Sequence, residues 1–237
     1  MGDFFYTSLM KVLVLGDGRL GQEIINQTGW DLLSRKKDKI DIHTFPKWMW
    51  KLEGYDVVLN CIANTDTYSF DYESIIKTNY EFVTHLVRFC DEMGIKLVHI
   101  STDYVYTNSG ERASETTIPV PDSSWYSLSK VLADEHIKLF SNDYLICRLS
   151  HKPKPFPYDS AWIDVKTNAD HTDVISSLVI QLIRKGAKGL YNVGTEEKTI
   201  YELAKQTNPN VAESLAPPHI PKNVTMDITK MKRFLEF

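Results

Sequence analysis

The stretch Val12-Leu-Val-Leu-Gly-Asp-Gly-Arg-Leu-Gly21 decides the fold of this chain. The apolar run over residues 11–15 is typical of a strand that is buried on both faces of a parallel sheet. Three glycines then match the spacing G-x-G-x-x-G, and residues 20–27 predict a helix. A strand, a glycine turn and a helix in this order indicate a unit that binds a dinucleotide.

Each glycine of the turn has an expected role. Gly16 makes the turn, Gly18 lets the backbone approach a pyrophosphate, and Gly21 lets the helix pack closely on the strand. The helix begins near Arg19 and Leu20, where unpaired N–H groups and the positive end of the helix dipole attract phosphate. These five residues are therefore predicted to contact the cofactor.

The rest of the chain continues to alternate between strands and helices. Strands are predicted at 31–34, 56–62, 95–101, 144–149 and 189–193, and helices at 74–93, 127–140, 173–184 and 199–206. The run Lys152-Pro-Lys-Pro-Phe-Pro157 predicts a connection that cannot be helical. This alternation predicts an α/β fold, a Rossmann-type doubly wound parallel sheet.

Length and composition limit the alternatives. The 237 residues fit one large α/β domain, or one domain with a small appendage. A hydrophobic fraction of 43% and a charged fraction of 24% are ordinary for a globular protein. The formal charge of −4 gives no electrostatic reason to expect nucleic acid or an anionic membrane as a partner. No apolar run approaches the roughly 20 residues that cross a bilayer.

The cysteines and the first residues point to the cytoplasm. Cys61, Cys90 and Cys147 are an odd number in apolar surroundings, which favours reduced thiols over a disulfide framework. Asp3 stands where a signal peptide would carry positive charge, and Tyr6 stands where a myristoylation motif wants Ser or Thr. We expect a soluble protein, and no metal site is predicted.

The end of the second predicted strand bears on the choice of cofactor. An acidic residue there would bind a free ribose, whereas a basic residue would bind a 2′-phosphate. Ser34 and Arg35 occupy this end, and Arg19 is expected to add positive charge near the same place. We therefore predict a preference for NADP(H), while NAD(H) and a merely solvated basic turn over 35–37 stay open.

A catalytic trio is predicted at the end of the strand at 95–101 and at the start of the helix that follows it. Tyr126 and Lys130 lie four residues apart on one helical face, and Thr102 ends the strand. Reduction of a ketone by hydride needs a proton donor, and free tyrosine has a pKa near 10. Lys130 is expected to lower this pKa and to bind the nicotinamide ribose, while Thr102 would orient the carbonyl. Tyr201 and Lys205 repeat the spacing late in the chain, where we expect packing.

Several motifs resemble a known family. They are Val12–Gly21, Leu33-Ser-Arg35 leading to Asp41-Ile42, Asp56–Ala63 followed by Thr65-Asp66, His99–Tyr106, and Tyr126-x-x-x-Lys130. Together they resemble the extended short-chain dehydrogenases/reductases, and within them the dTDP-4-dehydrorhamnose reductase family. The resemblance covers nearly the whole chain from Lys11. It implies an NAD(P)-dependent oxidoreductase.

The resemblance also implies roles for further residues. Asp41 and Ile42 would flank the adenine, and Cys61, Ile62 and Ala63 would line the cofactor channel. Asn79 corresponds to a helix asparagine behind the active site. The division that follows is a leader at 1–10, a dinucleotide-binding domain at 11–150, and a small substrate-binding portion at 151–237 packed on it.

The implied reaction is the NADP(H)-dependent reduction of a 4-keto-6-deoxy nucleotide sugar linked to dTDP or UDP. Tyr126 would be the general acid. One departure bears on the substrate: the family usually has a longer segment where only 151–170 is present here, so the sugar-nucleotide pocket is smaller, more open, or completed by another chain. A homodimer stays open.

Two other functions stay open. The regulatory subunit of methionine adenosyltransferase is similar to the same reductases, so this chain could bind NADP without catalysis. A reductase, epimerase or dehydratase for another carbonyl compound is the third alternative. The lack of a Glu directly after Asp103 argues weakly against the dehydratase.

Overall fold

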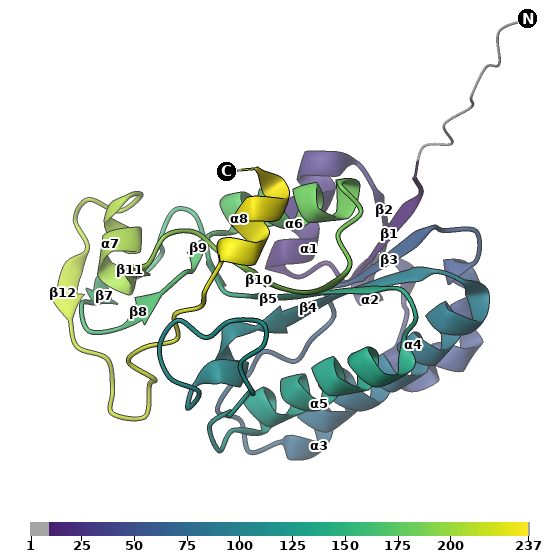
Figure 1. Ribbon diagram of the computed structural model, residues 1–237, viewed down its shortest axis with the longest axis horizontal. Helices are drawn as coiled ribbons and strands as arrows, with labels where there is room; N and C mark the ends of the chain where they lie inside the picture. The colour runs from purple at the N-terminus through teal and green to yellow at the C-terminus, as the bar shows by residue number, and fades with distance from the viewer. Residues whose placement is uncertain (1–9, 237) are drawn as a thin grey trace, which may run out of the picture.

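A six-stranded parallel sheet forms the centre of the molecule (Figure 1). The computed structural model describes residues 10–236, so the predicted leader lies outside the described residues except for Met10. The strand order is β10-β5-β4-β3-β1-β2, and every neighbouring pair is parallel. The strands are β1 Val12–Leu15, β2 Asp31–Leu33, β3 Val57–Asn60, β4 Lys96–Thr102, β5 Tyr144–Leu149 and β10 Gly189–Val193. The predicted Rossmann-type fold is confirmed.

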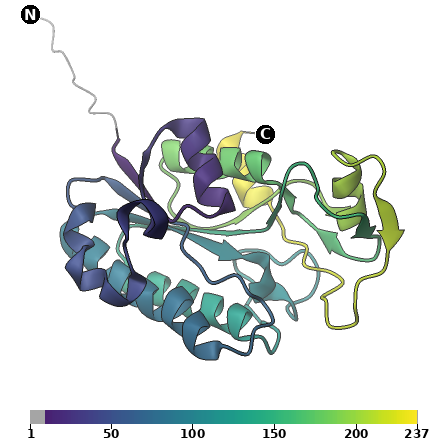
Figure 2. The same cartoon turned by 180° about the vertical axis from the view of Figure 1, so that it is seen from behind.

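Helices cover both faces of this sheet (Figures 1 and 2). One layer holds α1 Arg19–Thr28, α6 Thr172–Arg184 and α8 Thr229–Leu235, and the other holds α3 Tyr72–Ile76, α4 Phe82–Met93 and α5 Trp125–Phe140. The short helix α2 Arg35–Asp38 follows β2, and 3-10 helices occupy Ile42–Lys47, Met49–Leu52 and Asp103–Tyr106. Within residues 10–236, no helix has the length and apolar character needed to cross a membrane.

The first strand is buried on both faces, as its sequence predicts. Val12 and Val14 pack into the apolar cluster beneath α1 and α6. Leu13 and Leu15 pack into the opposite cluster, which contains the aromatic side chains of Phe45 and others. Side chains of a strand alternate between faces, so a continuous apolar run requires a core on each side.

The chain beyond residue 150 is shared between the central sheet and an outlying part (Figure 2). β10 lies at one edge of the central sheet, and α6 packs beside α1 in one of its helical layers. Both elements come after residue 150, so part of the chain beyond the predicted boundary belongs to the central fold. The outlying part has a small apolar cluster of its own around Phe156 and Ile200. Its elements are β6 His151–Lys152, β7 Ser160–Trp162, β8 Lys166–Thr167, β9 Asp170–His171, β11 Lys198–Thr199, α7 Ile200–Lys205 and β12 Ala212–Ser214.

Two helical segments differ from the sequence prediction. The single helix expected at 74–93 is interrupted by a π-helical turn at Lys77–Glu81, which carries the buried Asn79. The helix α8 was not predicted, although its Met231 and Leu235 are buried one turn apart. The short strands of the outlying part are also missing from the prediction, because pairs of two or three residues leave no periodic pattern.

Candidate active site

The turn between β1 and α1 has the backbone of a dinucleotide-binding loop. Gly16 has a φ of +97°, a left-handed conformation that residues with a side chain rarely adopt. A Cβ atom on Gly21 would lie 2.1 Å from the carbonyl oxygen of Gly16, so glycine is needed for the close packing of α1. Gly18 has an ordinary φ of −65°, and a Cβ atom on it would meet nothing within 4 Å. Gly16 and Gly21 thus shape the turn, while Gly18 leaves open space.

The N-terminus of α1 fits a phosphate group. Gly18 occupies the N-cap position, and no side chain caps the helix there. The first turn carries no acidic residue that would repel an anion. The N–H groups of a first helical turn have no partners within the helix, and the helix dipole adds positive potential. These features fit the pyrophosphate of a dinucleotide.

A cleft of about 800 Å³ opens beside the glycine turn. Its walls are the segments that follow β1, β2 and β3, at the place where β1 lies between β2 and β3 and the chain changes direction across the sheet. Ligands of open α/β sheets bind at such a switch point. The predicted cofactor residues that line it are Gly16, Gly18, Arg35, Asp41, Ile42, Cys61, Ile62 and Ala63.

Other predicted cofactor residues have structural roles instead. Leu20 is buried in the core beneath α1, and Gly21 packs on the turn. Ser34 is fully buried, and its hydroxyl oxygen accepts a hydrogen bond from the N–H of Lys37, so it caps α2. The predicted cofactor contacts of Leu20 and Ser34 stay predictions. The Leu20 side chain belongs to the core, so its backbone N–H at the start of α1 is the group that would face a phosphate, and the Ser34 hydroxyl caps α2.

Two cationic side chains line the cleft. Arg35 is one of them, as predicted, and the other is Lys39, which has a left-handed φ of 54° at the end of α2. Burial lowers the pKa of His151 and Lys152, and the positive charge of Arg19 lowers both further. That Arg19 adds to the charge of Arg35 stays a prediction. Lys39 was the residue that the basic run over 35–39 could have revealed.

The catalytic trio meets at the carboxyl edge of β4. Thr102 is the last residue of β4, and Tyr126 lies in the first turn of α5. The Thr102 hydroxyl is close enough to the Tyr126 phenol to lower its pKa. The hydroxyl oxygen of Thr102 also accepts from the N–H of Tyr104 at 3.2 Å. The structure thus brings together two of the three groups that a carbonyl reduction requires.

The phenol of Tyr126 differs from the expectation. Burial raises its pKa to about 12, and the nearby Thr102 hydroxyl opposes this rise only in part. The sequence predicted a lowered pKa, and that prediction was wrong for this arrangement. A phenol with this pKa carries its proton at neutral pH, which is the state that a proton donor needs.

Lys130 is almost completely buried, with 2% of its surface exposed. Its Nζ donates to the carbonyl oxygen of Ile100 at 2.6 Å and lies 3.0 Å from His99 Nε2. Burial lowers the pKa of Lys130 to about 8, although the charge of Asp134 opposes this shift. Lys130 is therefore held against β4 by its own hydrogen bonds.

Asp103 and Lys152 are charged residues of the site that the sequence did not single out. Asp103 accepts a hydrogen bond from the Thr102 hydroxyl at 3.2 Å and is buried. Burial raises its pKa to about 7, and the charge of Lys152 opposes the rise. Burial lowers the pKa of Lys152. Both residues follow the ends of central strands, which was the signal available in the sequence.

A series of aromatic side chains leads away from Tyr126. Tyr104 lies 6.4 Å from Tyr126 between ring centroids, and Tyr68 is close enough to Tyr104 to contribute to the rise of its pKa, which is due mainly to burial. The ring of His219 meets that of Tyr68 at 5.0 Å, edge to face. His219 belongs to the outlying C-terminal part, so that part reaches the neighbourhood of Tyr126. No local pattern predicts this meeting, because these residues are far apart in the chain.

Asn79 supports the site from behind, as the resemblance implied. Its amide oxygen accepts from the N–H of Asn64 at 2.7 Å, and its amide nitrogen donates to the hydroxyl of Ser129 at 3.1 Å. The π-helical turn brings this side chain into the interior. Such turns are frequent at functional sites.

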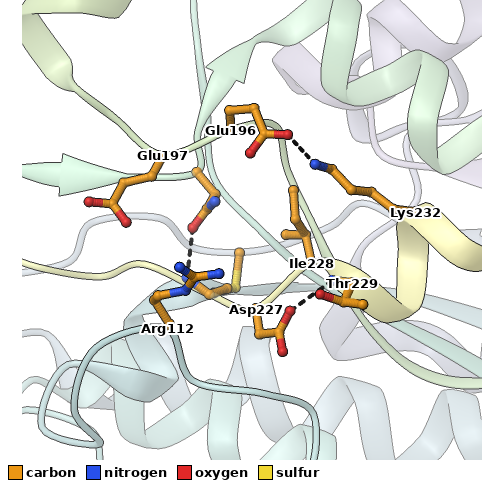
Figure 3. A pocket seen from close by; sticks show the side chains of 9 residues that line it. Arg112, Glu196, Glu197, Asp227, Ile228, Thr229 and Lys232 are labelled. Atoms are coloured by element: carbon orange, nitrogen blue, oxygen red, sulfur yellow. Dashed lines mark hydrogen bonds and ion pairs between the residues drawn. The ribbon is translucent and has the colours of Figure 1, made fainter. Parts of the chain in front are cut away.

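A second pocket, of about 110 Å³, lies away from these residues (Figure 3). Its walls include Arg112 and the ion pair between Lys232 and Glu196. Asp227 accepts a hydrogen bond from the N–H of Thr229 there. This pocket is small, and Glu196 and Lys232 are paired with each other in its wall. In the described part of the chain, no group of three or more His, Cys, Asp or Glu side chains could hold a metal ion.

The fold and the cleft define a Rossmann-type protein of the short-chain dehydrogenase/reductase class. A family model for the RmlD substrate binding domain matches residues 10–151. The chain belongs to this family.

Known proteins resemble parts or all of the chain. The spore coat polysaccharide biosynthesis protein SpsK of Bacillus subtilis is 29% identical over 150 residues, which are 60% of this chain and 53% of that protein. The dTDP-4-dehydrorhamnose reductase of Mycobacterium tuberculosis is 29% identical over 136 residues, 53% of this chain and 44% of that protein. The chain thus matches about half the length of these curated relatives.

A solved structure matches over a longer span. The dTDP-4-dehydrorhamnose reductase of Bacillus anthracis in complex with NADP has a TM-score of 0.79 at 20% sequence identity. The match covers 97% of this chain and 93% of that one. At this identity the likeness establishes the fold, including the outlying C-terminal part.

Proposed function

We propose that this protein reduces a 4-keto-6-deoxy nucleotide sugar with NADPH. The observation that carries the proposal is the meeting of the Thr102 hydroxyl with a Tyr126 phenol whose pKa is about 12. This pair lies at the carboxyl end of β4, where an open α/β sheet binds its ligands. A protonated phenol beside a second hydroxyl is suited to protonate a reduced carbonyl oxygen.

Several contacts support NADP(H) as the cofactor. The uncapped N-terminus of α1 would hold the pyrophosphate, and Asp41 and Ile42 would flank the adenine. Arg35 and Lys39 line the same cleft, and two cations there favour a 2′-phosphate over a free ribose. The solved structure of the Bacillus anthracis reductase contains NADP. NAD(H) would bind more weakly, because it leaves both cations without an anionic partner.

The proposed mechanism assigns one task to each member of the trio. The bound cofactor supplies the hydride. Thr102 donates a hydrogen bond to the substrate carbonyl and orients it toward Tyr126. Tyr126 donates its proton to the developing alkoxide. Lys130 donates a hydrogen bond to the nicotinamide ribose and so fixes the position of the cofactor.

The proposed substrate class rests on the surroundings of Tyr126 and on the relatives. Tyr104, Tyr68 and His219 offer aromatic surfaces beside the phenol, and rings of this kind pack well on sugars and bases. Lys152 and Arg19 add positive charge that would attract a diphosphate. The Mycobacterium tuberculosis relative is a dTDP-4-dehydrorhamnose reductase. We propose residues 151–237 as the part that completes the substrate pocket.

The test is NADPH oxidation against a panel of 4-keto-6-deoxy nucleotide sugars, with NADH in parallel. We expect Tyr126→Phe to lower turnover at least about 100-fold, because proton donation by a positioned side chain contributes this much. NADPH affinity, measured by fluorescence titration, should stay nearly unchanged. The control is Tyr201→Phe, since Tyr201 and Lys205 share the spacing but pack together in the outlying part.

Two outcomes would count against the proposal. Equal losses of turnover and NADPH affinity in Tyr126→Phe would mean that the phenol is not the acid. Tight NADPH binding without turnover of any substrate on the panel would favour a regulatory subunit that binds the cofactor without catalysis.

A further inference from the structure

A chain of hydrogen bonds leads from the wall of the cleft to Lys130. The N–H of Ile62 donates to Asn60 Oδ1 at 3.0 Å, and Asn60 Nδ2 lies 3.2 Å from His99 Nδ1. His99 Nε2 lies 3.0 Å from Lys130 Nζ, which donates to the carbonyl oxygen of Ile100 at 2.6 Å. Asn60, His99 and Lys130 are each at most 2% exposed, so water cannot replace these contacts.

The direction of each hydrogen bond is set by the backbone at one end. A backbone N–H can only donate, so the amide oxygen of Asn60 must face Ile62 and its amide nitrogen must face His99. An amide nitrogen also only donates, so His99 Nδ1 must be the unprotonated nitrogen. A neutral imidazole carries one proton, which therefore lies on Nε2 and points at Lys130 Nζ.

A charged ammonium could not complete this chain, because it has three donors and no lone pair. A neutral amine can accept from His99 Nε2–H, donate to the Ile100 carbonyl and keep one further N–H. We propose that Asn60 and His99 are positioning residues that favour the neutral amine form of Lys130 over the ammonium. The role of Lys130 in hydride transfer rests on the proposed function, but the direction of the hydrogen bonds does not.

The surroundings of Lys130 lower its pKa in one way and raise it in another. Burial favours the amine, whereas the carboxylate of Asp134 on α5 favours the ammonium. The thiol of Cys61, at the end of β3, has a pKa raised to about 12 by burial and is neutral at pH 7. Tyr126, one turn earlier on α5, is also neutral at that pH. The pKa of His99 is well below its usual range because of burial, so the ring adds no charge.

The substitution Asn60→Asp should reverse the direction of the hydrogen bonds from His99 onward without changing the size of the side chain. One carboxylate oxygen would accept a hydrogen bond from the N–H of Ile62, and the other would accept one from the protonated Nδ1 of His99. His99 Nε2 would then offer its lone pair to Lys130, and the ammonium would become the favoured form. Asn60→Leu should remove both hydrogen bonds of the Asn60 side chain, so that nothing at this position favours either tautomer of His99. Asn208→Asp, at a partly buried position in the outlying part, is the control for an added charge that lies outside this hydrogen-bond chain.

The test reads protonation directly by NMR. In the wild type above about pH 8, where the amine form of Lys130 predominates, imidazole ¹⁵N shifts should show His99 with a proton on Nε2 alone. The signal is assigned among seven histidines by its loss in His99→Gln. Titration followed by the ¹³Cε shift of Lys130 should give a pKa well below its usual value. Asn60→Asp should move the proton to Nδ1 and raise the pKa of Lys130 by at least about one unit. Asn208→Asp should change neither.

Either of two results would overturn the proposal. One is a wild-type His99 that carries its proton on Nδ1 or on both nitrogens, which can be measured even where Asn60→Asp does not fold. The other is a folded Asn60→Asp variant in which neither the tautomer nor the pKa of Lys130 changes. Neither readout requires turnover, so the proposal about the reaction can fail while this one stands.

Discussion

At the scale of single residues, the three glycines of the first turn are not equivalent. Gly16 needs its positive φ, and Gly21 needs its missing side chain because the Gly16 carbonyl oxygen occupies that space. Gly18 needs neither for the fold, since its φ is ordinary and its surroundings are open. Its small size is explained by what the cleft must admit, which is the backbone approach to a phosphate.

This difference predicts opposite effects of two alanine substitutions. Gly21→Ala should lower the free energy of unfolding by at least about 2 kcal/mol, because the new Cβ must displace backbone. Gly18→Ala should change that free energy by less than about 1 kcal/mol but weaken NADPH binding about tenfold or more. Urea unfolding and fluorescence titration measure the two quantities. The assignment of roles fails if Gly18→Ala is the more destabilised variant.

At the scale of elements, α5 carries the chemistry and its first turn is held by a cap. The hydroxyl oxygen of Ser124 accepts from the N–H of Ser127, and the hydroxyl donates to Asp122 at 2.6 Å. Tyr126 lies inside this first turn, and Lys130 follows one turn later. Fraying of the helix start would therefore move the proton donor before it affected the rest of the helix.

Removal of this cap should affect activity as well as stability. Ser124→Ala should lower the free energy of unfolding by about 1 kcal/mol and reduce turnover in the NADPH assay. Thr199→Ala is the matched control, because Thr199 caps α7 in a capping box within the outlying part. That variant should lose a similar free energy and keep its turnover. Equal turnover in both variants would show that the cap of α5 does not position Tyr126.

At the scale of the whole molecule, buried ionisable groups link the site to the stability of the fold. Arg148 and Asp134 form a buried ion pair at 2.8 Å between β5 and α5. Asp103 is buried at the end of β4, and its pKa is raised from 3.8 to about 7. A carboxyl with a raised pKa favours the folded state only while it is protonated.

The contribution of Asp103 to the free energy of unfolding should therefore fall as the pH rises from about 4 to about 7, by at most roughly 4 kcal/mol, since each unit of pKa is worth about 1.4 kcal/mol. Asp103→Asn should match the wild type at low pH and be more stable above pH 7. Asp164→Asn should instead be less stable than the wild type above about pH 4 and approach it only as the pH falls further, because Lys222 lowers the pKa of Asp164. Urea unfolding from about pH 2 to about pH 8 measures both differences. Parallel curves for Asp103→Asn and wild type would contradict the prediction.

The sequence by itself determined the elements and their order. The apolar run of β1, the glycine turn and the alternating pattern are local signals, and they predicted the parallel sheet and the places of Thr102 and Tyr126. Local signals suffice here because strand and helix periodicity depends on near neighbours.

Only the tertiary structure decided which side chains share a site and in what protonation state. It joined Asn60, His99 and Lys130 in one buried chain. These contacts join segments that lie far apart in the sequence. Burial and hydrogen-bond direction, which set the pKa of Tyr126 and Lys130, exist only after those segments have packed together.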